Sequence, residues 1–277
     1  MINKIICPVD FSSASINAVE YAARLAQVFE AQVILVNVQR IIMPVAALSM
    51  GEGIGAEARK NSLIVSKKLK DMAAETSFTF NISTTYEVEI TVKAFEKNFS
   101  DADGNNAMIV MGTNGIDDVD QYLFGTNTYN VIKKTNCPVL VVPENAAFGR
   151  MKKIVFAWDY SRRSNFSFSL LSQFMKAFNP QFVFLHVSKY PSEIGKDVFR
   201  ALRSEIIDVL GNDSNVEFEQ VFSDDIPESI NGYMMKKKAD MLSITFYNRG
   251  FISDLFHGTV TKDLSATAKY PVLVLHA

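Results

Sequence analysis

Two pairs of residues in the N-terminal half have the types and the spacing of a site for an anion. Gly112 and Gly115 follow a short apolar run, and they let the backbone turn and approach a ligand without an intervening Cβ atom. After nine further residues, Gly125 and Thr126 open a segment of helical period. Backbone N–H groups and a hydroxyl at a helix start attract an anion, with about 0.3–1 kcal/mol per charge from the helix dipole. This pattern favours binding of a phosphate-like group.

Short apolar runs alternate with segments of helical period, which is typical of a parallel sheet wrapped by helices. In the N-terminal half we expect strands at 4–9, 32–38, 79–86, 107–111 and 138–142. We expect helices at about 13–29, capped by Ser12 or Ser13, and at 57–74, 91–100 and 126–134. In such a sheet a ligand lies beyond the carboxyl ends of the strands, where the strand order reverses.

The chain also repeats itself. Adding 149 places residues 1–38 on 150–187 without a gap, and it pairs Asp10 with Asp159. Adding 133 places 125–142 on 258–275, and it pairs Gly-Thr with Gly-Thr and Pro-Val-Leu-Val with Pro-Val-Leu-Val. The sequence therefore predicts a tandem duplication with domains at 1–145 and 150–277. Because the second shift is smaller than the first, the second copy must be shorter somewhere between 187 and 240. Its expected strands are 153–157, 181–187, 216–221, 241–245 and 271–275.

The overall composition excludes several classes of protein. The chain has 277 residues, 48% of them hydrophobic, and a net charge of −2, which predicts a folded protein without general attraction to nucleic acid. It has no apolar run of about 18 residues, and Pro8 and Asp10 interrupt the N-terminal run too early for a signal peptide. We therefore expect a cytoplasmic protein that crosses no membrane. Cys7 and Cys137 are expected to be buried, reduced thiols.

The pattern Gly112-x2-Gly115-x9-Gly125-Thr126, the following run at 130–142 and the opening Pro-Val-Asp-Phe-Ser of 8–12 resemble the universal stress protein family. The resemblance covers both copies. It implies for each copy a doubly wound, five-stranded parallel α/β sheet of the adenine nucleotide alpha-hydrolase-like, Rossmann-like type, with the copies paired about a pseudo-twofold axis. It also implies non-catalytic binding of ATP or AMP in a stress response.

The resemblance also assigns roles to individual residues. It places the adenine and ribose near Asp10 and the backbone of Val38, with Pro8 and Met111 lining the cleft. It places the phosphates against Gly112, Gly115, Gly125, Thr126 and the backbone of Asn127. For Asp10, an N-cap of the following helix is an equal alternative. For Gly112 and Gly115, a plain turn is the alternative.

The loop between Gly115 and Gly125 departs from the family pattern, because it carries Asp117, Asp118 and Asp120 where basic residues are common. Two like charges 4 Å apart repel by about 1 kcal/mol in water and by about 4 kcal/mol at an effective dielectric of 20. Aspartates facing the phosphates would therefore disfavour a bare triphosphate. The alternatives are a solvated loop that points away, or a divalent cation such as Mg²⁺ between aspartate and phosphate.

The second copy has lost more of the pattern. Thr245 and Asn248 stand where the first copy has Gly112 and Gly115, while Asp159 and Gly258-Thr259 persist. We expect this copy to be mainly structural. His186, at a strand end, is interpreted as a core residue, and His257 as a surface or helix-cap residue.

Three functions compete. The leading one is a non-catalytic adenine-nucleotide-binding stress module that serves an unknown protein partner, with the copies paired within the chain and a homodimer as a further option. The second is a stress scaffold or signalling partner that binds no nucleotide. The third is an enzyme with slow nucleotide hydrolysis assisted by Asp10 and a metal. The predicted cleft shows neither a nucleophile with a base in reach nor a Gly-x4-Gly-Lys-Ser/Thr loop, so we expect no enzyme.

Overall fold

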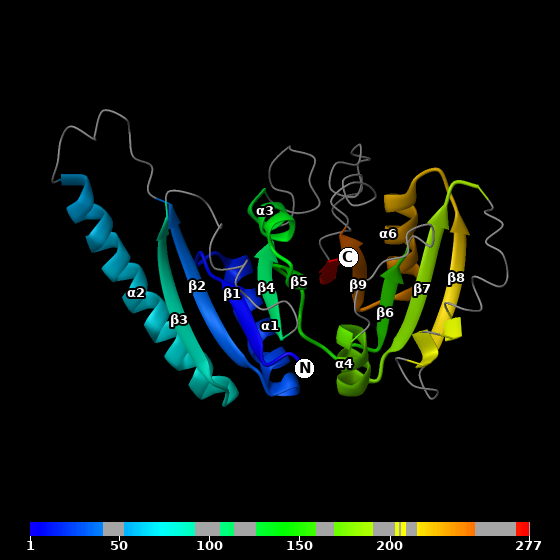
Figure 1. Cartoon of the computed structure of the whole chain (residues 1–277), viewed down its shortest axis with the longest axis horizontal. Helices are drawn as coiled ribbons and strands as arrows, with labels where there is room; N and C mark the ends of the chain where they lie inside the picture. Colours follow the sequence, from blue (N-terminus) through cyan, green and yellow to red (C-terminus); the bar gives the residue numbers. More distant parts are fainter. Residues whose placement is uncertain are drawn as a thin grey trace. The chain divides into compact units, whose positions relative to one another are not determined.

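The computed structural model describes residues 1–40, 53–91, 106–113, 126–158, 169–190, 203–204, 206–208, 215–246 and 270–276. The chain forms two compact units (Figure 1). We refer to Ile2–Thr113 with Asn127–Glu144 as the N-terminal unit, and to Asn145–Ala277, which makes up most of the other unit, as the C-terminal unit.

The N-terminal unit is a parallel sheet with strand order β3-β2-β1-β4-β5. Along the chain its elements are β1 (Lys4–Pro8), α1 (Ser13–Phe29), β2 (Gln32–Arg40), α2 (Gly53–Phe80), β3 (Thr84–Thr91), β4 (Ala107–Thr113), α3 (Thr126–Lys134) and β5 (Val139–Pro143). Because β2 and β3 lie to one side of β1 while β4 and β5 lie to the other, the strand order reverses between β1 and β4. A doubly wound sheet binds its ligands at such a reversal.

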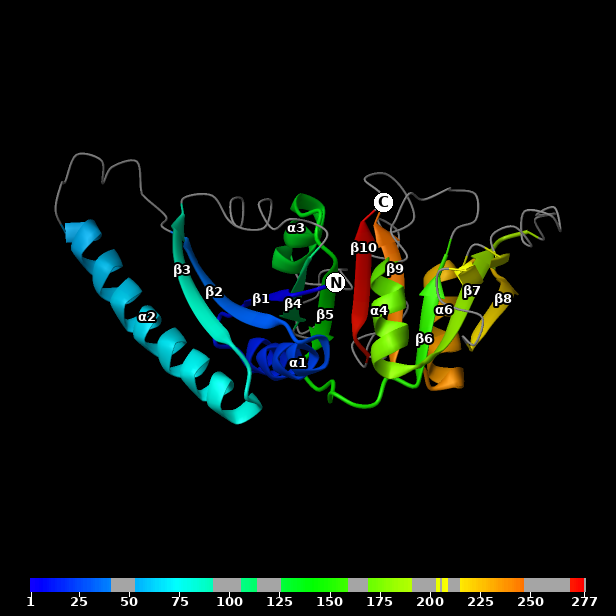
Figure 2. The same ribbon diagram turned by 60° about the horizontal axis from the view of Figure 1, so that its bottom comes forward.

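Helices α1 and α2 contact each other and therefore cover the same face of this sheet, with α2 alongside β3 (Figures 1 and 2). Helix α1 begins after Ser12, whose Oγ accepts the N–H of Ser15 at 3.2 Å, as predicted for a serine N-cap. Its buried face repeats with helical period through Ala18, Ala22, Leu25 and Phe29.

The C-terminal unit has the strand order β10-β9-β6-β7-β8, again with parallel pairs throughout. Its elements are β6 (Lys153–Ala157), α4 (Ser169–Phe178), β7 (Gln181–Ser188), β8 (Val216–Phe222), α6 (Ile226–Lys237), β9 (Met241–Phe246) and β10 (Val272–His276). Its core is aromatic: the Phe184 ring lies 5.4 Å from that of Phe156 and 5.2 Å from that of Phe218.

The two units share their strand registers. The Lys4–Gln32 pair of β1 and β2 recurs, under the first shift of the sequence, as Lys153–Gln181. The pairs of β4 with β5 recur under the second shift, as with Ile109–Val139 and Leu242–Val272. The second unit is shortened between β7 and β8, the counterpart of the segment that carries α2.

The predicted fold class, a five-stranded parallel sheet with helices in each half, is confirmed, but the bounds of α2 and of β3 were wrong. The strand predicted at 79–86 begins only at Thr84, because α2 extends beyond the predicted 57–74 and ends at Phe80. The helix predicted at 91–100 lies outside the described residues, apart from Thr91, which ends β3. Cys7 and Cys137 are buried free thiols, as predicted, and burial raises the pKa of Cys7.

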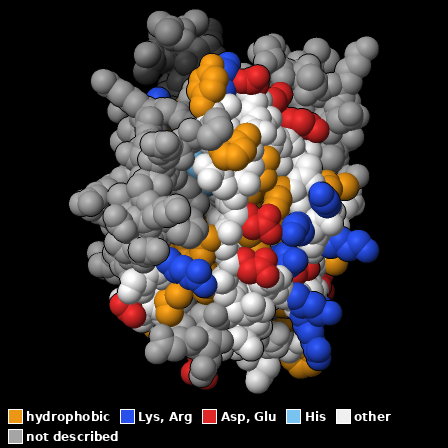
Figure 3. Space-filling model, turned by 90° about the vertical axis from the view of Figure 1, so that its right-hand side faces the viewer, with side chains coloured by type: hydrophobic (Ala, Val, Ile, Leu, Met, Phe, Trp, Pro, Cys, Tyr) orange, Lys and Arg blue, Asp and Glu red, His pale blue; other side chains and the backbone are white. Residues whose placement is uncertain are grey.

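The surface carries both signs of charge. Figure 3 shows a face on which basic and acidic side chains are interspersed. In the C-terminal unit, Lys237 Nζ lies 3.1 Å from Glu219 Oε1, and Lys189 Nζ lies 3.1 Å from Asp224 Oδ1. Lys236 and Lys237 form the last turn of α6, where cations complement the helix dipole. No helix in the described residues is both long and apolar enough to span a membrane.

Candidate functional site

The carboxyl ends of β2, β1 and β4 bring part of the predicted site to one edge of the N-terminal sheet. Pro8 is the last residue of β1, and Val38 lies near the end of β2. Met111 and Gly112 lie at the end of β4, which pairs with β1 at the reversal of strand order. The edge therefore carries Pro8, Asp10, Val38, Met111 and Gly112.

The predicted phosphate contacts fall on α3 and on the loop before it. Thr126 is the first residue of α3 and Asn127, which is exposed, is the second. Gly115, Gly125 and the aspartates Asp117, Asp118 and Asp120 lie outside the described residues. Because α3 follows β4, its N-terminus belongs to the carboxyl edge of the sheet.

Asp10 organises the turn between β1 and α1. Its Oδ1 accepts the N–H of Ser12 at 2.9 Å and the Ser12 hydroxyl at 2.6 Å, which is an Asx turn. Partial burial raises the pKa of Asp10, but the hydrogen bonds from Ser12 outweigh burial and hold the pKa below its ordinary value. The N-cap interpretation of Asp10 was wrong, because Ser12 caps α1. Asp10 is a carboxylate at the edge of the sheet, and its contact with a ribose stays a prediction.

Phe11, inside this turn, adopts a backbone conformation that non-glycine residues rarely take. Its φ of 66° lies in the left-handed region. Lys68 Nζ of α2 lies 5.8 Å from the centroid of the Phe11 ring, within cation–π range. Strained residues cluster at binding sites. The sequence assigned no role to either side chain, because their contact arises only when α2 packs near the turn after β1.

Gly112 lies against the first turn of α1. A Cβ atom on Gly112 would be 2.3 Å from the carbonyl oxygen of Ala14 and 2.8 Å from the backbone nitrogen of Ser15. The missing side chain therefore allows close packing of β4 on α1. The plain-turn alternative for Gly112 was wrong, because Gly112 lies within strand β4. The contact of Gly112 with a phosphate stays a prediction.

The end of β2 continues beyond the end of β1. The N–H of Val9 donates to the carbonyl of Val36 at 2.8 Å, as the last backbone rung between these strands. In a parallel ladder the next rung would run from the Val38 N–H to the Val9 carbonyl, so the peptide groups of Val38 face the β1 side. The Val9 carbonyl instead accepts Nδ2 of Asn37 at 2.7 Å. Val38 thus presents a donor and an acceptor to the space beyond β1.

Asn37 is a residue that the sequence analysis passed over. Its side chain is 8% exposed, and within the described part of the chain its Oδ1 has no hydrogen-bond partner. A buried acceptor without a donor costs free energy, so Asn37 is held at this position by its other bond, to the Val9 carbonyl. The available signal was a polar residue within the apolar run Gln32–Arg40.

The corresponding edge of the C-terminal unit is only partly described. His186 is buried, as predicted, and its Nδ1 lies 2.9 Å from the carbonyl oxygen of Trp158. Thr245, at the position of Gly112, is buried in β9. Asn248 and the remaining predicted residues of this copy lie outside the described residues: Asp159, His257, Gly258 and Thr259. No set of three or more potential metal ligands occurs among the residues that the structure covers.

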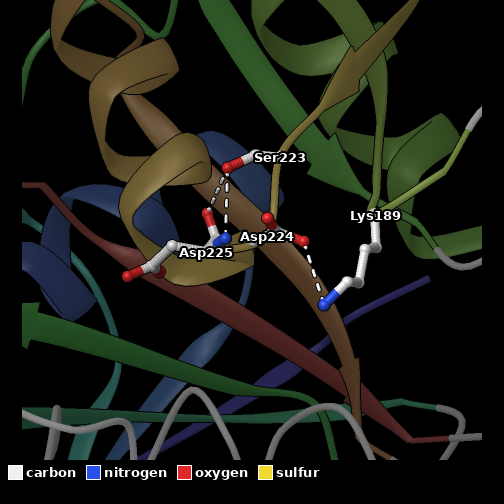
Figure 4. A network of polar contacts seen from close by, with 4 residues as sticks. All are labelled: Lys189, Ser223, Asp224 and Asp225. Atoms are coloured by element: carbon white, nitrogen blue, oxygen red, sulfur yellow. Dashed lines mark hydrogen bonds and ion pairs between the residues drawn. The ribbon is translucent and has the colours of Figure 1, made fainter.

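A polar network lies beyond the end of β8 (Figure 4). Ser223 Oγ accepts the N–H of Asp225 at 3.1 Å and donates to its carbonyl at 3.1 Å. Asp225 in turn caps α6 by accepting the N–H of Glu228 at 3.0 Å. These contacts provide hydrogen-bond partners for the polar groups of the turn between β8 and α6, so the network stabilises this turn.

Sequence and structure comparisons identify the family. The model of the universal stress protein family matches residues 1–143. The chain belongs to the universal stress protein family. Universal stress protein MJ0531 of Methanocaldococcus jannaschii is 32% identical over 143 residues, which are 50% of this chain and 81% of that protein. YxiE of Bacillus subtilis is 27% identical over 154 residues, 51% of this chain and 99% of that protein.

The fold match with a solved structure extends over both halves of this chain. A universal stress protein from Archaeoglobus fulgidus DSM 4304 covers 99% of this chain, and this chain covers 98% of it, with a TM-score of 0.71 and 17% identity. At this identity the likeness concerns the fold alone. The predicted family is confirmed by the match to residues 1–143, and the predicted fold class is confirmed for both halves of the chain.

Proposed function

We propose that the N-terminal unit of this universal stress protein binds an adenine nucleotide, ATP or AMP, and catalyses no reaction on it. The observation that carries the proposal is the Val38 backbone, which faces the space beyond the end of β1. This space lies at the reversal of strand order, where doubly wound sheets bind ligands.

The edge of adenine complements these backbone groups. Adenine offers an acceptor at N1 and a donor at its 6-amino group, whereas guanine offers a donor and an acceptor in the reverse order. The Val38 N–H and C=O therefore match adenine and oppose guanine. Pro8 and Met111 supply apolar contacts, and the Asp10 carboxylate is an acceptor for the ribose hydroxyls.

The N-terminus of α3 supports the placement of the phosphates. Thr126 and Asn127 open this helix, and their backbone N–H groups are among those that a helix leaves without intrahelical partners. Such a terminus attracts an anion. Gly115 and Gly125 complete the proposed phosphate contacts. If Mg²⁺ accompanies the nucleotide, the carboxylates of Asp117, Asp118 and Asp120 would be the residues to hold it, and the ion would offset the phosphate charge.

Calorimetric titration of the full chain with ATP and AMP, with and without Mg²⁺, tests this function. We expect saturable binding of one nucleotide per chain, and a stabilisation of about 2.7 kcal/mol at 100 times Kd. Gly125→Val should abolish binding. The matched control Gly258→Val, at the equivalent position of the second copy, should retain it. Wild-type protein that shows neither heat nor a melting shift at millimolar nucleotide would overturn the proposal and favour a stress scaffold.

A further inference from the structure

The side chain of Asn37 replaces one rung of the backbone ladder between β2 and β1. Nδ2 of Asn37 donates to the Val9 carbonyl at 2.7 Å, and the side chain is 8% exposed. The adjoining backbone rung, from the Val9 N–H to the Val36 carbonyl, is 2.8 Å long. Val9 is therefore held to β2 at both its N–H and its carbonyl.

The bond from Asn37 to the Val9 carbonyl takes the place of a bond from the Val38 N–H. In a regular parallel ladder the Val38 N–H would donate to the Val9 carbonyl. Because the carbonyl accepts the Asn37 amide instead, the Val38 N–H is not required by the sheet at this point. The Asn37 side chain thus supplies the hydrogen bond that the Val9 carbonyl needs, and the Val38 N–H can donate to another partner.

The C-terminal unit makes the same bond with a different side chain. Trp158, the counterpart of Val9 in the repeat, donates its N–H to the Leu185 carbonyl at 2.9 Å. Its carbonyl oxygen lies 2.9 Å from Nδ1 of His186, the equivalent of Asn37, and His186 is also 8% exposed. A carbonyl only accepts, so Nδ1 carries the proton. The shared feature of the two units is a buried donor to this carbonyl.

We infer that Asn37 is a positioning residue for base selectivity: by capping the Val9 carbonyl, it keeps the Val38 peptide available to the edge of adenine. This inference rests on the proposed function, and it adds a role that the nucleotide-contact residues do not supply. Without a donor at 37, the Val38 N–H is the donor that a regular parallel ladder would supply to the Val9 carbonyl. The base would then lose a donor, while the phosphate contacts at α3 would remain.

The test compares ATP and GTP affinities of the full chain by calorimetry. Asn37→Leu should weaken ATP binding by about 10-fold, which corresponds to ~1.4 kcal/mol. The GTP affinity should stay unchanged. The ratio of ATP affinity to GTP affinity should therefore fall by the same factor as the ATP affinity. Asn37→His, which keeps a donor as in the C-terminal unit, should bind ATP within about 3-fold of wild type, a change below ~1 kcal/mol. Asn37→Val also removes the donor and suits a strand, so it replaces the Leu variant if that protein does not fold.

His186→Leu is the matched control, because it removes the same bond from the other unit. It should lower the melting temperature without changing the ATP affinity. Unchanged ATP selectivity in a folded Leu or Val variant would overturn the inference, as would a His variant that binds ATP as weakly as the Leu variant. Absence of ATP binding by the wild-type protein would instead overturn the proposed function itself.

Discussion

Replacing Gly112 by Ala tests how closely α1 must approach β4. The added Cβ atom would lie 2.3 Å from the Ala14 oxygen and 2.4 Å from its carbonyl carbon, whereas ordinary contacts begin at 3.4 Å. Both atoms belong to the backbone, so no rotamer change relieves the clash. The first turn of α1 or the end of β4 must move by about 1 Å, the difference between these distances.

The expected cost follows from overpacking, which destabilises by about 1–3 kcal/mol. The lower entropy of the unfolded alanine chain offsets about 0.4–1 kcal/mol of this cost. We therefore expect Gly112→Ala to lower the free energy of unfolding by about 1.3 kcal/mol, from the middle of each range. For a domain of this size, this corresponds to a fall in melting temperature of roughly 3–5 °C.

The measurement is urea and thermal unfolding in the absence of nucleotide. Gly149→Ala is the matched control, because a Cβ atom there meets nothing within 4 Å. It should leave the melting temperature within about 2 °C, since surface changes alter stability by only about 0.5 kcal/mol. A Gly112→Ala protein that unfolds like wild type would refute the packing argument. If that same protein lost nucleotide binding, Gly112 would act through the ligand instead.

Three further changes test the turn after β1 and the start of β6. Ser12→Ala should lower stability by about 0.5–2 kcal/mol through loss of the N-cap, and it should raise the pKa of Asp10, which an NMR titration of the carboxyl measures. Because the pKa of Asp10 is lowered in the folded state, its stabilisation is present above the unfolded value of about 3.9 and is lost as pH falls through the folded pKa. Asp10→Asn should therefore reduce the acid-induced loss of stability, and urea unfolding at a series of pH values measures it; an unchanged profile contradicts this. Asp240 Oδ2 accepts two N–H groups at the start of β6, at 2.7 and 2.8 Å. Asp240→Ala should lower stability by about 1–3 kcal/mol in urea unfolding, and a change below about 0.5 kcal/mol would show that water replaces these bonds.

The positions of the strands followed from local patterns, whereas the end of α2 did not. Apolar runs and the two shifts located strands such as β1 and β6, because buried parallel strands are continuous apolar runs. The prediction ended α2 too early because its buried face, Leu69, Ala73 and Thr76, includes a polar residue. Thr79 and Phe80 have strand propensity, which tertiary packing overrides. Asn81 follows the end of α2 with a φ of 50°. An asparagine at this position was a signal in the sequence for the true helix end.

The site was predictable only where it is made of sequence-local features. Asp10 follows one apolar strand and Val38 lies near the end of another, so the carboxyl edge could be inferred from topology. The packing of Gly112 on Ala14 joins residues far apart in the sequence, so no local pattern contains it. Asn37 gains its role only because β1 ends at Pro8 while β2 continues to Arg40. That difference in strand length is a property of the folded sheet.

Comparison of the two units explains why equal strand registers need not give equal sites. Both units hold the carbonyl after their first strand with a buried side-chain donor, Asn37 in one and His186 in the other. At the position of Gly112, however, the C-terminal unit has Thr245, whose buried Oγ1 lacks a hydrogen-bond partner within the described residues. A helix placed as α1 is in the N-terminal unit would meet the Thr245 Cβ at its first turn. The duplicated sheet is thus preserved, while the glycine that allows the close packing of α1 on β4 is not, and this difference favours one nucleotide per chain.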